Sequence, residues 1–477
     1  MFEEKLEEFE PIFHPKSIAV IGASANEAKM GSMWVKGLIS SGFEGGIYPV
    51  SRSGGSTLGL KIFPNLRAIP EEVDYVIVSI PRQRVLELLD DCIAKKVKAV
   101  HFFTAGFSEL AKPEGRDLEE QMVRKARQGN FRIIGPNCIG TYCPESKVPL
   151  ISRIGVSGSV GFISQSGGLA DKLAEFGIAR HINFSKGVSF GNGIDLDASD
   201  FLQYLTADPK TTIIGAYLEG TRNGRRLFDT MKKAAQVKPV IVWKGGKTEV
   251  GAEAAMSHTG SLASSAAIWS AALKQSGAIE VQNLEELADT LLIFQQLGHW
   301  KGNNVAVMGG IGGGGGGISV SASDACTENG VNMPPISSKT RDELLNLMGE
   351  VGTILRNPID LSQSLGGGFS TLSKAIELVV ADPIIELIII QEDVDILQSY
   401  LSQGGAEMLN KFLIDLRGRQ SKPLVLVLPP GSAEPERLKA EEKLLSASIP
   451  VFPTMERAAK AIARSNQYFS SRQEIPG

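Results

Sequence analysis

A histidine and a glutamate in the middle of the sequence have the side chains that phosphoryl transfer uses. His258 lies in a run of small residues, 254–261, that follows a predicted strand at 238–244. Glu219 closes the predicted strand 211–220, at the edge of a parallel sheet where ligands bind. A carboxylate there could hold one ring nitrogen of a histidine and leave the other nitrogen as a nucleophile toward phosphorus. Taken singly, a solvated loop histidine and a charge facing water remain the alternatives for these two residues.

Three turns rich in glycine or serine connect a predicted strand to a predicted helix. They span residues 22–26, 164–168 and 309–317. The N-terminus of a helix presents unpaired N–H groups and the positive end of the helix dipole, which suits phosphate. One such turn is weak evidence, because glycine fits strand-to-helix turns for geometric reasons alone. Three of them together with His258 predict an anion-binding site.

A fourth turn, 134–140, ends the first predicted α/β block. It places Asn137 and Cys138 on a rigid Gly-Pro turn, where a polar amide and a thiol could meet a ligand. An asparagine-stabilised turn with a small buried thiol is the alternative.

Composition excludes several classes of protein. The chain has 49 Lys and Arg against 53 Asp and Glu, and no block of like charge predicts binding to nucleic acid or membrane lipid. The four cysteines have no metal-ligand spacing, so we expect free thiols, no metal site and a reducing cytoplasm. The N-terminal segment is acidic and no run of about eighteen apolar residues occurs, so we expect a soluble cytoplasmic protein.

Apolar runs of strand length alternate with helical periods along the whole chain. This is the pattern of parallel sheets covered by helices on both faces. A chain of 477 residues with 43% hydrophobic residues is long enough for about three domains of ordinary size. We therefore predict an α/β protein whose three consecutive domains span residues 1–148, 149–299 and 300–477.

Six motifs occur in an order that is known from one enzyme family. They are Ile134-Gly-Pro-Asn-Cys138, Ser164-Gln-Ser-Gly-Gly168, Tyr217-Leu-Glu-Gly220, Ser257-His-Thr-Gly-Ser261, the glycine-rich turn 309–317 and Asn357-Pro-Ile-Asp-Leu361. With these motifs the chain closely resembles, over nearly its whole length, the α subunit of ADP-forming acyl-CoA synthetases, which are relatives of succinyl-CoA synthetase. The resemblance implies an N-terminal Rossmann-like CoA-binding domain followed by two flavodoxin-like domains.

The resemblance also implies roles for single residues. His258 matches the family's phosphorylated histidine, and Glu219 matches the carboxylate that orients it. Two opposed helix N-termini would grip the phosphoryl group, at Ser164, Gln165, Ser166 and Gly167 and at Gly312, Gly313 and Gly314. The residues expected along the path of CoA are Gly22, Ala23, Ser24, Ala25, Asn26, Ile80, Pro81, Thr104, Ala105, Gly106, Asn137 and Cys138, with Asn137 at the thioester end.

The implied reaction converts an acyl-CoA such as acetyl-CoA, phosphate and ADP into the acid, CoA and ATP. Phosphate attacks the thioester, and the acyl phosphate formed passes its phosphoryl group to His258 and then to ADP. We find no ATP-grasp domain in the sequence, so the resemblance implies a separate β subunit that carries the nucleotide and Mg²⁺, in an α₂β₂ assembly. Acetate is the acid we expect.

Two departures from the family pattern stand out. Val50 is followed by Ser51-Arg-Ser53 where family members commonly have Asn-Pro-Lys, so Arg52 would have to replace the lysine that contacts CoA. The run of six glycines at 312–317 is longer than usual, which adds conformational entropy that is lost on ordering.

Two other functions are alternatives to the synthetase reaction. One alternative is a CoA-binding regulatory or scaffolding subunit without phosphoryl transfer, and the presence of both His258 and Glu219 argues against it. A nicotinamide-dependent oxidoreductase is disfavoured because the first turn lacks the GxGxxG pattern and no acidic residue closes the strand at Val50.

Overall fold

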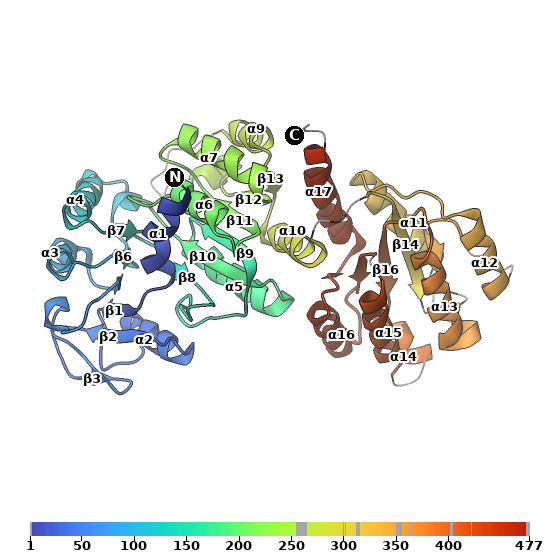
Figure 1. Cartoon of the computed structure of the whole chain (residues 1–477), viewed down its shortest axis with the longest axis horizontal. Coiled ribbons are helices and arrows are strands. Elements are labelled where there is room, and N and C mark those ends of the chain that lie inside the picture. The colour runs from blue at the N-terminus through green and yellow to red at the C-terminus, as the bar shows by residue number, and fades with distance from the viewer. Residues whose placement is uncertain are drawn as a thin grey trace. The chain divides into compact units, whose positions relative to one another are not determined.

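The structure, a computed structural model, forms two compact units, residues 1–291 and 292–477. It describes residues 2–253, 265–298, 300, 302–311, 315–349, 355–362, 364–400, 404–420 and 422–473. The first unit contains two large sheets, one parallel and one parallel except for an edge strand, and the second unit contains one parallel sheet; helices flank each of the three (Figure 1). The predicted α/β class is confirmed.

The first sheet has five parallel strands in the order β2-β1-β5-β6-β7. Its strands are β1 (Ser17–Ile21), β2 (Gly46–Val50), β5 (Tyr75–Val78), β6 (Ala99–Phe102) and β7 (Arg132–Ile134), and the helices between them are α2 (Met30–Ser40), α3 (Val85–Lys95) and α4 (Pro113–Gly129). The strand order reverses between β1 and β5. Ligands of doubly wound sheets bind at such a reversal, beyond the carboxyl ends of the strands.

The second sheet has six strands in the order β13-β12-β11-β9-β10-β8. Its strands are β8 (Gly140–Tyr142), β9 (Ser157–Ser164), β10 (Phe184–Ser189), β11 (Ile213–Leu218), β12 (Val240–Lys244) and β13 (Ile279–Val281), with helices α5 (Gly167–Arg180), α6 (Ala198–Ala207), α7 (Gly224–Val237), α9 (Ala266–Ser276) and α10 (Leu284–Leu297). Here the order reverses between β9 and β11, so the turns that follow those two strands meet at one edge.

Two segments, one before and one after the first sheet in the sequence, pack against the second sheet and its helices. Strand β8 pairs with β10 as an antiparallel edge. Helix α1 (Phe2–Phe13) lies against α6 (Figure 1), and Phe9 and Phe13 stack on Tyr204 with ring centroids 4.9 and 4.8 Å apart. The first two sheets are therefore joined by packing as well as by the chain, and the domain boundary near residue 150 stays a prediction.

The third sheet, in the second unit, has the order β15-β14-β16-β17-β18 and is parallel throughout. Its strands are β14 (Val305–Ile311), β15 (Ile359–Asp360), β16 (Leu387–Glu392), β17 (Leu424–Val427) and β18 (Val451–Phe452), and its helices are α11 (Gly315–Glu328), α12 (Ser338–Met348), α13 (Gly368–Val380), α14 (Val394–Tyr400), α15 (Gly405–Arg419), α16 (Glu434–Ser446) and α17 (Met455–Gln473). The remaining elements are β3 (Ser56–Thr57), β4 (Leu60–Lys61) and the 3₁₀ turns η1 (Leu66–Ala68), η2 (Arg82–Arg84), η3 (Ser108–Leu110) and η4 (Ser364–Gly367).

Burial explains why apolar runs locate the strands. A strand covered by helices on both faces is apolar at every position rather than at alternate ones. In β16 the run 387–390 is fully buried, and in β5 all four residues are buried. Strands β8, β13 and β15 have only two or three residues each, and each includes a polar residue, so they do not form apolar runs.

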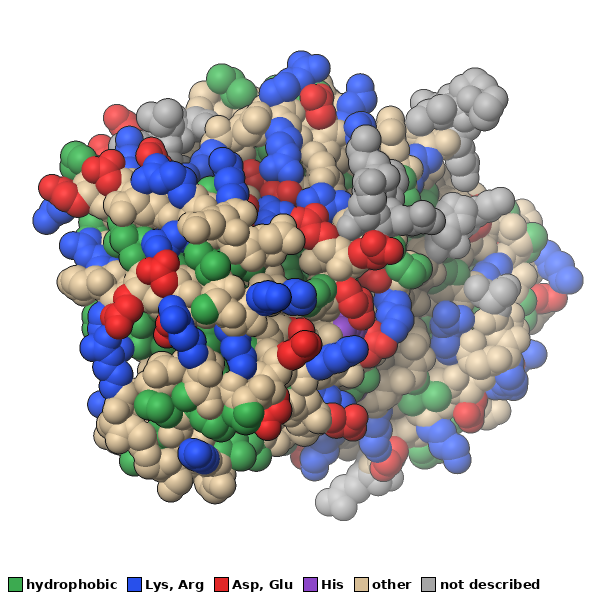
Figure 2. Space-filling model, turned by 60° about the vertical axis from the view of Figure 1, so that its left-hand side comes forward, with side chains coloured by type: hydrophobic (Ala, Val, Ile, Leu, Met, Phe, Trp, Pro, Cys, Tyr) green, Lys and Arg blue, Asp and Glu red, His purple; other side chains and the backbone are tan. Residues whose placement is uncertain are grey.

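The surface shows no large field of one charge on the face in view. Figure 2 shows Lys and Arg side chains interspersed with Asp and Glu side chains. Among the described residues, no helix is both long enough and apolar enough to span a membrane.

Candidate functional site

The turn after β9 and the turn after β11 meet at the strand-order reversal of the second sheet. Ser164, the last residue of β9, is the register partner of Tyr217 in β11. Glu219 comes two residues later and is half-buried. Gln165 links the two turns, because its Oε1 accepts hydrogen bonds from the backbone N–H groups of Glu219 (2.8 Å) and Gly220 (3.0 Å).

The serine-rich turn leads directly into helix α5. Ser166 is the N-cap, and its Oγ accepts from the N–H of Leu169 at 3.4 Å. Ser164 is 2% exposed, and its Oγ donates to the carbonyl of Ser166 at 2.7 Å, which closes the turn. The side chains of Ser164 and Gln165 thus hold backbone groups, whereas Ser166 and Gly167 lie at the open helix N-terminus, where the dipole favours an anion.

Glu219 has a cation and a phenol near it. Burial raises the pKa of Tyr217. The negative charge of Glu219 and its hydrogen bond with the Tyr217 hydroxyl raise this pKa further. Lys244, at the end of β12, is 3% exposed, with Nζ 5.2 Å from the ring centroid of Trp269. Burial lowers the pKa of Lys244, and the carboxylate of Glu219 acts against that shift. Glu219 therefore lies between a phenol and a buried cation, and both interact with its carboxylate.

A cavity of about 530 Å³ joins the two sheets of the first unit. Its walls come from the turns after β5, β6 and β7 on one side and from the α5 N-terminus on the other. It is lined by Ser79, Ile80, Pro81, Phe103, Thr104, Ala105, Asn137, Cys138, Ile139, Ser166, Gly167 and Gly168. Six of the predicted CoA-binding residues and two of the predicted phosphate-binding residues therefore share one cavity.

The turn that carries Asn137 is held by a loop from the second sheet. Asn137 has φ +59°, and its N–H donates to the carbonyl of Thr104 at 3.0 Å. Asn192 N–H donates to the carbonyl of Pro136 at 3.0 Å, and a Cβ at Gly191 would lie 2.3 Å from that same oxygen. Because this approach needs glycine, the loop 191–195 is part of the site. Sequence reasoning missed it, although its Gly-Asn-Gly-Ile-Asp sequence after a strand was the available signal.

A charge pair fixes the end of that loop. Arg132 donates to Asp195 through Nε and one terminal nitrogen, both at 2.9 Å, and the backbone N–H of Ile133 donates to the same carboxylate at 2.8 Å. Paired hydrogen bonds of this kind fix geometry as well as adding energy. The loop is therefore attached to β7 next to the Asn137 turn.

Cys138 is buried under this turn and is no candidate nucleophile. Its side chain is 3% exposed, and burial raises the pKa of the thiol far above neutral pH. Behind it, His101 Nε2 lies 3.0 Å from the carbonyl of Cys138, and burial lowers the pKa of His101 to about 4. The imidazole is therefore neutral and its Nε2–H donates to that carbonyl, so His101 supports the turn.

A second cavity, of about 90 Å³, lies at the strand-order reversal of the first sheet. Gly22, Arg52, Asn65, Ile80 and Arg84 are among its lining residues. Gly22 has φ +99°, and a Cβ there would lie 2.2 Å from the carbonyl oxygen of Ser79, so the two turns approach as closely as glycine allows. The cavity offers two arginines, and Arg52 also donates to the exposed Glu87 at 2.7 Å.

Other predicted residues of the first domain lie outside both cavities. Ala23 is buried, and Ala25 and Asn26 are exposed. Ser24 N–H donates to Ser32 Oγ at 3.0 Å, and the Gly106 carbonyl accepts from Arg82. His258, Gly312, Gly313 and Gly314 lie outside the described residues, so their predicted roles rest on the sequence alone.

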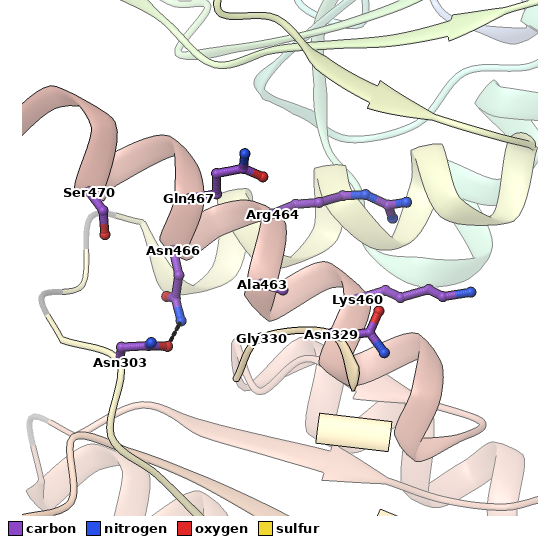
Figure 3. A pocket seen from close by; sticks show the side chains of 9 residues that line it. All are labelled: Asn303, Asn329, Gly330, Lys460, Ala463, Arg464, Asn466, Gln467 and Ser470. Carbon is purple, nitrogen blue, oxygen red and sulfur yellow. Dashed lines mark hydrogen bonds between the residues drawn. The ribbon is translucent and has the colours of Figure 1, made fainter. Parts of the chain in front are cut away.

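The second unit has a hollow that contains none of the predicted site residues. It has a volume of about 400 Å³ and lies between helix α17 and the chain before β14 (Figure 3). Asn466 Nδ2 donates to Asn303 Oδ1 at 2.6 Å across its wall. Asn303 stands at the amino end of its sheet, the end opposite to that where parallel sheets bind ligands.

Comparisons with known proteins agree with this geometry. A CoA binding domain family matches residues 16–144, and a family described as succinyl-CoA ligase like flavodoxin domain matches residues 157–294. The chain is 35% identical to the α subunit of the ADP-forming acetate–CoA ligase I of Pyrococcus furiosus, over 95% of this chain and 96% of that protein. It is 30% identical to the ADP-forming 4-hydroxybutyrate–CoA ligase of Nitrosopumilus maritimus, over 98% of this chain and 65% of that protein.

A solved structure is similar to this chain over nearly its whole length. It is the dinucleotide-forming acetyl-coenzyme A synthetase 1 of Ca. Korarchaeum cryptofilum in complex with phosphate and ADP. The TM-score is 0.84 at 31% identity, and the match covers 98% of this chain and 97% of that chain. The predicted order of a CoA-binding domain, a succinyl-CoA ligase-like domain and a further parallel-sheet domain is confirmed.

Proposed function

The chain belongs to the family of ADP-forming acyl-CoA synthetases, and on that premise we propose that it is an α subunit that makes and uses a phosphohistidine at His258. The observation that carries the proposal is the shared cavity. It places Asn137 and the turns of the CoA-binding domain opposite the N-terminus of α5. A thioester that enters from the first domain would reach a phosphate held by that helix.

In the first step, a phosphate oxygen attacks the thioester carbonyl, the C–S bond breaks and the CoA thiolate leaves. The N–H groups at the start of α5 hold the charge of the phosphate without reorganising. Asn137 makes no side-chain hydrogen bond within the described part of the chain, so its amide is available to the thioester oxygen. The product is an acyl phosphate in the cavity.

In the second step, a neutral ring nitrogen of His258 attacks phosphorus, and the P–O bond to the acyl group breaks, which releases the acid. The ring becomes a cation on phosphorylation. Glu219 would accept a hydrogen bond from the other ring nitrogen, fix the tautomer and stabilise that cation. ADP then takes the phosphoryl group, and in reverse the same steps activate an acid at the expense of ATP.

The nucleotide half of the reaction belongs to a partner. The Pyrococcus relative is named as an α subunit, and this chain spans nearly all of it. We infer a separate ATP-grasp β subunit that binds ADP or ATP with Mg²⁺, in an α₂β₂ assembly. The described residues contain no cluster of acidic, histidine or cysteine side chains that could bind a metal ion.

The acid is proposed to be acetate. The two relatives named above act on acetate and on 4-hydroxybutyrate, which differ in length and polarity. A panel of acyl-CoA esters tests the choice, and acetyl-CoA ranking far below larger esters would refute it.

The decisive experiment is to label the histidine. The chain and its β subunit are incubated with acetyl-CoA and radiolabelled phosphate, and wild type is compared with His258→Ala. We expect acid-labile, base-stable label on this chain in wild type and none in the variant. If no acyl-CoA labels the wild type, the protein is a CoA-binding subunit without phosphoryl transfer.

A further inference from the structure

Gln165 joins two turns of the candidate site through hydrogen bonds. It is 5% exposed and lies in the turn that starts helix α5. Its backbone N–H donates to the carbonyl of Tyr217 at 3.0 Å, and its Oε1 accepts from the N–H groups of Glu219 and Gly220 at 2.8 and 3.0 Å. Three hydrogen bonds from one residue therefore join the α5 turn to the Glu219 turn.

The position of these bonds explains why a side chain is needed. The register between β9 and β11 ends at the pair Ser164 and Tyr217, so no strand residue is left to accept from the N–H groups that follow. Buried N–H groups require partners. Gln165 supplies the missing acceptor one residue beyond the end of the strand and thereby sets where the backbone of Glu219 lies.

A second anchor of the same turn is more exposed. Arg222, three residues after Glu219, donates to the buried Glu119 of helix α4 at 2.9 Å, and its side chain is 52% exposed. Of these two anchors, Gln165 is the more buried.

We propose that Gln165 is a positioning residue of phosphoryl transfer, which holds Glu219 at the correct place relative to the α5 N-terminus rather than binding phosphate itself. The inference rests on the proposed function, because it matters only if Glu219 orients His258. In the proposed reaction, the Glu219 carboxylate contacts a ring nitrogen of His258 while helix α5 holds the phosphoryl group. The distance between the carboxylate and the helix must therefore be fixed. Gln165 spans that separation with a side chain whose acceptor oxygen already has two donors.

The test uses Gln165→Met, which keeps the volume and removes the acceptor, in the complex with the β subunit. The control is Gln203→Met, the same change at a half-buried glutamine on α6 whose Nε2 lies 3.4 Å from Thr230 Oγ1. Two rates are measured separately: release of CoA from acetyl-CoA by phosphate, and formation of phosphohistidine from acetyl phosphate. For Gln165→Met we expect CoA release close to wild type and phosphohistidine formation slower by roughly tenfold to a hundredfold, because a small displacement of an orienting group is costly.

A double variant separates positioning from general damage. If Gln165 acts through Glu219, then Gln165→Met combined with Glu219→Gln is no slower in phosphohistidine formation than Glu219→Gln alone. Multiplying effects, or equal loss of both measured rates, would overturn the proposal. A raised KM for phosphate with kcat unchanged would instead make Gln165 a phosphate ligand.

Two results would complicate the comparison: a Gln165→Met variant that does not fold, and a wild type that is not labelled. If Gln165→Met does not fold, Gln165→Asn replaces it, since the shorter side chain also withdraws the acceptor, and the same comparison with Glu219→Gln decides. Absence of label on wild-type His258 refutes the proposed function and is visible without any Gln165 variant.

Discussion

Glu392 is a buried carboxyl whose replacement should stabilise the second unit in a pH-dependent way. It is the last residue of β16, it is 0% exposed, and neither of its carboxyl oxygens has a hydrogen-bond partner among the residues that the structure describes. Burial raises its pKa from 4.5 to about 8, and the neighbouring Asp393 acts in the same direction. The change we consider is Glu392→Gln, which keeps the shape of the protonated acid and cannot ionise.

The sign follows from proton binding. Between pH 4.5 and about 8 the folded chain holds a proton on Glu392 that the unfolded chain has lost. The free energy of unfolding of the wild type therefore falls as pH rises through this range. One pKa unit corresponds to about 1.4 kcal/mol. The free energy of unfolding of Glu392→Gln should therefore exceed that of the wild type by about 4 kcal/mol at pH 8 and by less than about 1 kcal/mol at pH 5.

The assay is calorimetric unfolding of the full chain at several pH values from 5 to 8, with the transition of the second unit compared between wild type and variant. Glu328→Gln, the same change at an exposed position on α11, is the control. The expected result is an upward shift of the variant's transition that grows steadily with pH, while the control does not shift. A shift that is the same at pH 5 and pH 8, or a variant that is less stable at pH 8, would refute the reasoning.

Two further predictions concern the Asn137 turn. Gly191→Ala would place a Cβ 2.3 Å from the carbonyl oxygen of Pro136 at φ +52°, so we expect a loss of about 1 to 3 kcal/mol in stability and slower CoA release from acetyl-CoA, measured by denaturation and by a thiol assay. Cys138→Ala should keep wild-type labelling of His258, because the thiol is buried and protonated, and loss of the label would make Cys138 a participant.

Sequence alone was sufficient for features that depend on burial and on local turns. The run 385–390 is almost wholly apolar and indicates β16, because a strand covered on both faces is apolar throughout. The turn 164–168 predicted the start of α5 because a serine followed by small residues suits a helix N-terminus. These signals lie within a few residues of the element that they predict.

Features that depend on distant contacts could not be read from the chain. The loop 191–195 is part of the site only because Gly191 and Asn192 meet the turn at Pro136, more than fifty residues earlier. The place of Gln165 in the turn predicts a phosphate ligand, whereas its contact with the backbone of Glu219 joins the ends of two neighbouring strands and is not visible in the sequence. Nothing local distinguishes a glutamine that binds a ligand from one that holds a neighbouring turn.

The cavity's lining indicates how the site manages charge. None of the twelve described residues that line it is Asp, Glu, His, Lys or Arg, although phosphate and an acyl phosphate are both anions. In the proposed reaction, their charge would be met by backbone N–H groups at the start of α5 and by groups outside this lining. N–H groups fixed by a helix stay in place as the charge moves from phosphate to acyl phosphate to carboxylate, whereas a lysine or arginine would bind each of these anions and retard the release of the acid. A cavity without charged side chains, next to the turn that Gln165 ties to Glu219, fits the proposed transfer of the phosphoryl group to His258.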